Sequence, residues 1–127
     1  MKIFFAFALI LAATESPSGW VIRDNISAED KLIDNLYRIQ VKRNREYLFS
    51  GTLKDRHLKD GYFYLGNCEK NGIVRTDLIA YATYHYDQPF AVKIYTVWKI
   101  DIARKKILMV SPRGVRCPNE SFGLHLK

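Results

Sequence analysis

Hydrophobic and polar residues alternate most regularly between Phe90 and Ser111. One parity of this stretch is apolar except at Thr96, and it carries Phe90, Val92, Ile94, Trp98, Ile100 and Ile102. The other parity carries Lys93, Lys99 and Asp101, and this period of two is typical of a strand with one face in water. A basic stretch, Arg104 to Lys106, precedes a second apolar run. The pattern predicts a long β-hairpin with the basic stretch at its tip, and with Val92, Ile94, Trp98 and Ile100 buried.

Shorter segments with strand signatures precede and follow this hairpin. Tyr37 to Lys42 alternates strictly, a turn follows at Asn44 and Arg45, and Glu46 to Phe49 is expected to pair back. The strongest two-residue turn signal is Asn71-Gly72. Other segments rich in strand formers are Gly61 to Gly66, Leu78 to Tyr86 and Ser121 to Leu126. About seven short strands, with turns roughly every 8 to 12 residues, predict an all-β antiparallel sandwich, with a small barrel as the alternative.

Two polar segments are expected to lie outside the sheets. Trp20 to Asp34 is rich in carboxylates, and it predicts a loop or at most a short helical turn opened by Ser27. Gly51 to Asp60 is the most polar inner segment of the chain, and it predicts an exposed loop.

The N-terminus has the layout of a secretory signal peptide. A short basic start, Met1-Lys2, precedes the uncharged run Ile3 to Ala13, and small polar residues follow. A helix of that length rises only about 16 Å, which is too short for a bilayer core of about 30 Å. A buried first strand or helix is the alternative. We expect residues 1–18 to be removed by cleavage between residues 14 and 19, which leaves residues 19–127 as one exported domain.

Export would place both cysteines in an oxidising compartment. A disulfide between Cys68 and Cys117 is then the simplest arrangement, and an intermolecular bridge or two free thiols are the alternatives. Two glycosylation sequons, at Asn25 and Asn119, also fit an exported chain.

The net charge of +7 indicates an anionic partner, such as a microbial surface, a glycosaminoglycan, an anionic lipid or extracellular nucleic acid. The best candidate for its contact is the predicted hairpin tip, formed by Arg104, Lys105 and Lys106. Loops from one end of a sandwich would form a cationic rim around such a partner. The alternative is a soluble protein with an ordinary basic surface.

The residue types give little sign of catalysis. Neither H-E-x-x-H nor C-x-x-C occurs, so the sequence predicts no metal site and no cofactor. Asp55, Arg56 and His57 form the best acid–base group, and a small basic exported chain with histidines and lysines is compatible with a ribonuclease. We favour a solvated loop for this group and a position packed within a sheet for His85.

The central predicted strands are dense in tyrosine, at Tyr62, Tyr64, Tyr81, Tyr84, Tyr86 and Tyr95. Tyrosine rings pack well in an apolar cavity while their hydroxyls reach water. A cavity between the sheets would suit a carrier of a lipid or small apolar molecule. Ordinary core packing is the alternative.

Three stretches carry a family resemblance: Glu29 to Ile33, Leu78 to Asp87, and Ser111-Pro112-Arg113-Gly114. In these, over roughly residues 29–126, the chain resembles the insect multiprotein bridging factor two family, which includes pathogen-response proteins. It departs from that family in lacking a glycine-rich stretch near Gln88 to Tyr95 and in carrying two cysteines. The resemblance implies a β-rich, exported insect protein linked to defence or to transcription-factor bridging, and it implies no site residue.

These observations predict a secreted, extracellular, non-enzymatic binding protein with a basic surface, in host defence or in a secretory fluid such as saliva. The alternatives are a carrier of a small apolar ligand and a small basic ribonuclease.

Overall fold

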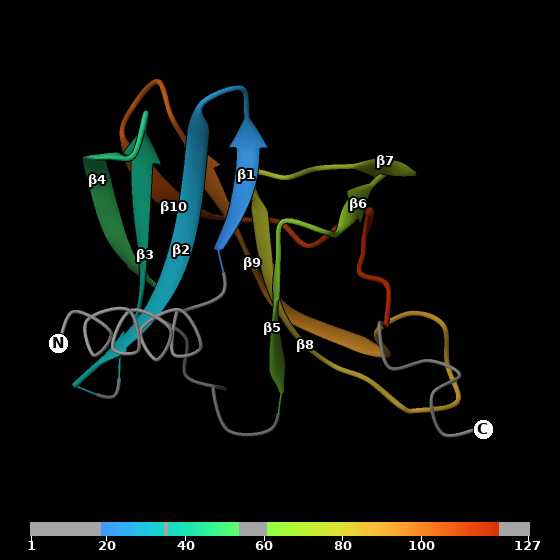
Figure 1. The fold of residues 1–127 in the computed structure, drawn as a ribbon. Coiled ribbons are helices and arrows are strands. Elements are labelled where there is room, and N and C mark those ends of the chain that lie inside the picture. The colour runs from blue at the N-terminus through green and yellow to red at the C-terminus, as the bar shows by residue number, and fades with distance from the viewer. Residues whose placement is uncertain (1–18, 35, 54–60, 120–127) are drawn as a thin grey trace, which may run out of the picture.

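The computed structural model describes residues 19–34, 36–53 and 61–119, which form antiparallel β-sheets (Figure 1). The strands are β1 (Gly19–Arg23), β2 (Ile26–Ile33), β3 (Leu36–Arg43), β4 (Glu46–Leu53), β5 (Tyr62–Leu65), β6 (Glu69–Lys70), β7 (Ile73–Val74), β8 (Leu78–Thr83), β9 (Lys93–Asp101), β10 (Lys106–Val110) and β11 (Val115–Arg116). The all-β prediction is confirmed for these residues. No helix that could cross a membrane occurs among them. The predicted signal peptide and the strand predicted at 121–126 lie outside the described residues.

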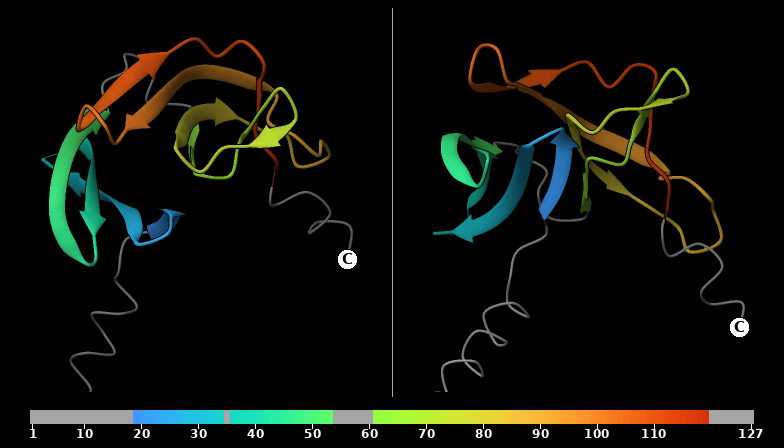
Figure 2. Two further views of the ribbon diagram at one scale, coloured as in Figure 1. Left: turned by 90° about the horizontal axis from the view of Figure 1, so that it is seen from above. Right: turned by 45° about the horizontal axis from the view of Figure 1, so that its top comes forward.

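Two four-stranded sheets share one hydrophobic core. The first sheet has the order β1-β2-β3-β4, and the second has the order β10-β9-β8-β5. Seen from above in Figure 2, both sheets curve, and the first turns toward the second. Their shared core contains Ile39, Val41 and Leu53 from the first sheet and Ile79, Trp98 and Ile100 from the second. The short sheet-forming segments thus bury apolar surface that no single hairpin could bury alone.

The second sheet is covered on its other face by a disulfide-linked lobe. The lobe is a small sheet with the order β11-β6-β7, and it adjoins the Cys68–Cys117 disulfide, which is confirmed. Both cysteines are fully buried, and they pack with Leu78, Ala80 and Val97 of the second sheet. The predicted Asn71-Gly72 turn joins β6 to β7, with positive φ at both residues.

The loop or helical turn predicted over residues 20–34 is wrong, because this segment forms the β1–β2 hairpin. The inward face carries Ile22, Ile26 and Ala28, which are buried in the shared core. The acidic residues that suggested a loop lie at other positions along β2, where Glu29 contacts Lys42 of β3 at 3.3 Å. Pairing with β3 along the whole length of β2 outweighs the low strand propensity of these acids.

The predicted loop at 51–60 also begins too early, because β4 continues through Leu53. Leu53 is only 1% exposed and belongs to the shared core. Gly51 brings β4 close to the second sheet, since a Cβ at this position would lie 2.9 Å from Cδ1 of Ile107 on β10. Residues 54–60, including the acid–base group Asp55, Arg56 and His57, lie outside the described residues.

The β9–β10 hairpin forms as predicted, but its inward parity changes within β9. The pairing of β8 with β9 matches Tyr81 with Thr96 and Ala82 with Ile94, so Tyr95 is an extra residue, or β-bulge. Trp98 and Ile100 face the shared core, whereas Ile94 packs on the disulfide side of the sheet. The expected burial of Val92 is wrong: it precedes β9 and is 62% exposed.

Candidate functional site

Arg104, Lys105 and Lys106 lie at the tip of the β9–β10 hairpin, where the sequence predicts them. Lys106 pairs with Asp101 across the hairpin, and all three cations are exposed. The Asp101 carboxylate accepts a hydrogen bond from the Arg104 backbone N–H at 3.1 Å, and it lies 3.7 Å from Arg104 Nε. Asp101 therefore holds the turn in shape and partly neutralises one of the three charges.

Two other turns bring further arginines to the same end of the molecule. Figure 1 places the β1–β2, β3–β4 and β9–β10 turns at this end. The first two turns are joined directly, because the Asn44 backbone N–H donates to the Asn25 carbonyl oxygen at 2.9 Å. Arg23 and Arg43 are both register partners of Ile26, one on each side of it. Strand spacing of about 4.8 Å therefore puts their Cα atoms about 10 Å apart.

We call this region the cationic end, defined by Arg23, Arg43, Arg45, Arg104, Lys105 and Lys106. All six side chains belong to exposed residues. Within the described ranges, Arg104 is the only one of the six in an ion pair. The neighbouring carboxylates Asp24, Glu46 and Asp101 leave the end with an excess of positive charge. Charges without local partners remain available for a ligand.

A cleft opens into the cationic end between the C-terminal end of β1 and the tip side of the β9–β10 hairpin, where β9 ends and its turn begins. It has a volume of about 360 Å³. Its lining residues are Ile22, Arg23, Val74, Arg75, Thr76, Asp77, Lys99, Ile100, Asp101, Ile102 and Ala103. The cleft, called here the β1–β9 cleft, thus combines aliphatic side chains with groups of both charges.

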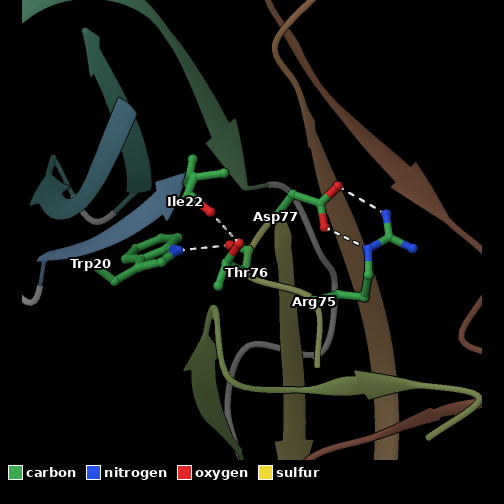
Figure 3. Close-up of polar contacts among 5 residues, drawn as sticks. All are labelled: Trp20, Ile22, Arg75, Thr76 and Asp77. Carbon is green, nitrogen blue, oxygen red and sulfur yellow. Dashed lines mark hydrogen bonds and ion pairs between the residues drawn. The ribbon is translucent and has the colours of Figure 1, made fainter. Parts of the chain in front are cut away.

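The segment 75–77 fixes one wall of this cleft against β1. Thr76 Oγ1 donates to the Ile22 carbonyl oxygen at 2.6 Å, and Trp20 Nε1 donates to the Thr76 carbonyl oxygen at 2.8 Å. Figure 3 shows Thr76 pointing toward β1, while Arg75 and Asp77 turn toward each other on the opposite side. The Asp77 carbonyl oxygen also accepts the Ile100 backbone N–H at 2.8 Å. These bonds tie β1, the wall and β9 together.

Arg75 is locked into this wall by Asp77. Its Nε and Nη2 donate to the two carboxylate oxygens at 3.0 and 2.9 Å. These hydrogen bonds raise the pKa of Arg75, partial burial opposes the rise, and the attraction of the carboxylate adds to it. Because Asp77 compensates Arg75, the uncompensated cations of the cleft are Arg23 and Lys99, neither of which has an ion-pair partner among the described residues.

The two sequons have different environments. Asn25 is exposed, and its Nδ2 donates one hydrogen bond, to Asn44 Oδ1 at 2.7 Å. Asn119 is 6% exposed, and its Nδ2 donates to the carbonyl oxygens of His85 at 3.0 Å and Gln88 at 2.9 Å. A glycan replaces one hydrogen of Nδ2, so at Asn119 it would break one of these bonds. Glycosylation stays a prediction, and this geometry favours Asn25.

His85 does not pack within a sheet as expected. Strand β8 ends at Thr83, so His85 falls in the following turn and is exposed. Its Nδ1 lies 2.7 Å from Asp87 Oδ1, and its ring stacks on Tyr86. Three or more metal-ligating side chains do not come together anywhere in the described parts of the chain.

The central tyrosines pack mainly against other rings. Tyr81 contacts Phe63 with ring centroids 4.9 Å apart, and Tyr62 contacts Tyr84 at the same distance. Tyr62 and Tyr86 are mostly exposed, whereas Tyr64 and Tyr81 are buried. The β1–β9 cleft and a second cleft along residues 85–92 are both lined by other residues. A tyrosine-lined carrier cavity between the sheets therefore stays a prediction.

Comparison with known proteins adds no relative: no protein-family model, curated protein or solved structure matches the chain. The sequence pointed to the hairpin tip but not to Arg23 or Lys99, because neither belongs to a basic run. Arg23 lies in a segment expected to be a loop, and Lys99 lies on the wet face of a predicted strand. Only the pairing of β1 with β2 and the packing of segment 75–77 bring them to one cleft.

Proposed function

We propose that the protein is a secreted, non-enzymatic binding protein that takes an extended anionic polymer across its cationic end. The observation that carries this proposal is the gathering of exposed cations from three separate turns at one end of the molecule. Three turns spread the charges over a surface, which suits a polymer with repeated anionic groups better than a single small anion. Sulfated polysaccharides have this chemistry.

The charge distribution supports electrostatic capture. A net charge of +7 raises the local concentration of polyanions around the molecule, and the cationic end offers them partners not already neutralised. Exposed contacts of this kind are weakened by salt, because the screening length is only about 8 Å at physiological ionic strength. Binding at the cationic end is therefore expected to depend steeply on salt.

Neutralising the hairpin tip should weaken the binding of heparin, used as the polyanion. We expect the triple variant Arg104→Gln, Lys105→Gln, Lys106→Gln to bind heparin about ten- to hundred-fold more weakly, since three exposed charge contacts contribute about 0.5–1 kcal/mol each. The three side chains are exposed, so the fold should be unaffected. Titration by calorimetry at two salt concentrations measures the change.

The matched control removes the same amount of charge elsewhere. Lys31→Gln, Lys93→Gln and Arg113→Gln alter three cations outside the cationic end, and this variant should bind heparin within about three-fold of the unmodified protein. If both variants lost heparin affinity equally, the loss would follow from the lower net charge alone, and the assignment to the cationic end would be overturned. Weaker binding of heparin than of a neutral polysaccharide would overturn the proposed function itself.

The export proposal rests on the N-terminal pattern and is compatible with the disulfide. When the full chain is expressed in secreting eukaryotic cells, we expect a chain beginning at residue 15 or 19, an intact Cys68–Cys117 bond and a glycan at Asn25. Mass spectrometry of the medium measures all three, and recovery of the intact Met1 chain inside the cell would contradict export. A setting in host defence is proposed on the family resemblance, and a secretory fluid such as saliva is proposed as the other setting for an exported protein.

A further inference from the structure

We infer that the β1–β9 cleft is a site for a small anionic amphiphile, a molecule with one anionic head group and a short aliphatic chain, such as a medium-chain carboxylate or alkyl phosphate. This site goes beyond the proposed polymer binding and does not depend on it. It has a different geometry, because the cleft is a single concavity rather than a spread of turns.

The size of the cleft selects the class of ligand. A volume of about 360 Å³ lies at the lower end of the range of about 300–1,000 Å³ that is usual for small-molecule sites. A polymer chain or a bilayer would contact the rim of such a cleft without filling it. The cleft therefore suits one small molecule.

The charges of the cleft select the head group. The charge of Arg75 is neutralised by Asp77, to which it donates two hydrogen bonds. The Asp101 carboxylate accepts a hydrogen bond from the Arg104 backbone N–H and forms an ion pair with the Arg104 side chain. The lining cations that keep their full charge are Arg23 and Lys99, neither of which is ion-paired within the described sequence. These two cations would attract an anionic head group and repel a cationic one.

The aliphatic lining selects the rest of the ligand. Ile22 and Ile100 are almost fully buried and lie at the boundary with the core, while Ile102 and Ala103 belong to the hairpin turn. Val74 is 58% exposed although it is a large apolar residue on the cleft wall. A short alkyl chain packed on Val74 and Ile102, which still expose apolar surface, would remove that surface and its own from water, which a bare inorganic anion cannot do.

Binding of octanoate below its micelle concentration tests the inference. We expect saturable binding of octanoate by the mature protein, at least about ten-fold tighter than binding of acetate, which has the head group alone. Octanol and octyltrimethylammonium, which lack the negative charge, should bind at least about ten-fold more weakly than octanoate. Backbone amide NMR titration gives both the affinities and the location, which should centre on residues 22–23, 74–77 and 99–103.

Two variants separate the head-group contact from the apolar contact. The double variant Arg23→Gln, Lys99→Gln should lose at least about ten-fold in octanoate affinity. Val74→Ser should lose about three- to ten-fold. Ile73→Ser is the matched control for the second variant, because Ile73 is the adjacent residue, is 68% exposed and does not line the cleft. It should leave octanoate binding unchanged.

The outcomes distinguish this site from the polymer site. Val74→Ser should bind heparin as the unmodified protein does. The double variant Lys105→Gln, Lys106→Gln keeps Arg104 beside Asp101, so it should bind octanoate with unchanged affinity. Acetate binding as tightly as octanoate, or Ile73→Ser reducing affinity as much as Val74→Ser, would overturn the amphiphile site. An unchanged midpoint of thermal unfolding in every variant would show that the lower octanoate affinity reflects lost binding and not lost folding.

Discussion

Replacing both cysteines, Cys68→Ala with Cys117→Ala, is expected to lower the free energy of unfolding by about 2–5 kcal/mol. The bond closes a loop across a sequence separation of 49 residues, for which the loss of unfolded-chain entropy alone corresponds to roughly 4 kcal/mol. In addition, the lobe that the bond anchors contains only two-residue strands, which have few hydrogen bonds of their own. Against a typical total stability of about 5–15 kcal/mol, this is a large fraction.

Urea unfolding at equilibrium measures the effect of the double variant. The control is the unmodified protein unfolded in the presence of a thiol reductant, which should approach the stability of the variant. A loss below about 1 kcal/mol in both experiments would contradict the prediction, and it would mean that the small sheet is held by packing on Leu78 and Val97 rather than by the disulfide.

Gly66→Ala is expected to destabilise the protein by about 2–4 kcal/mol. Two costs combine at this position. The backbone has φ of +73°, which an alanine adopts with strain, and the added Cβ would overlap the indole ring of Trp20. Moving the ring would also break the bond from Trp20 Nε1 to the Thr76 carbonyl oxygen, so β1 would lose its contact with the cleft wall.

Gly72→Ala is the matched control for this variant. Gly72 also has a positive φ, +86°, but nothing lies within 4 Å of the position of an added Cβ. Gly72→Ala should therefore destabilise the protein only through the strained backbone conformation, by about 1 kcal/mol. The difference between the two variants in chemical denaturation isolates the clash with Trp20. Equal destabilisation by both would show that the indole ring moves freely and would contradict its role as a link between β1 and residues 75–77.

The local hairpins of this fold could be predicted from the sequence. Tyr37 to Lys42 alternates strictly and ends at Asn44-Arg45, and the structure pairs it with the following strand through that turn. Asn71-Gly72 and the basic tip at Arg104 to Lys106 are likewise turns between adjacent paired strands. These features depend on periodicity and turn chemistry, which act between residues close in sequence.

The main failures of prediction have one physical origin, which is that pairing with the neighbouring strand, rather than a segment's own residues, decides the segment's conformation. The segment 20–34 has weak strand propensity, but β2 becomes a strand because β3 satisfies its backbone along eight register pairs. The bulge at Tyr95 exists only relative to β8, so strict alternation from Phe90 to Ile102 placed Ile94 on the wrong face and Val92 in the core. No local pattern marks either event.

The sequence by itself determined the fold class, the hairpin tip and the pair of cysteines available for a disulfide. The tertiary structure decided which cations lie together. Arg23, Arg75 and Lys99 are separated by dozens of residues, and they line one cleft because Thr76 and Trp20 bind β1 to the segment before β8. Long-range contacts of this kind carry no periodic signal along the chain, since they are set by how the sheets pack on their shared core rather than by the residues next to each contact.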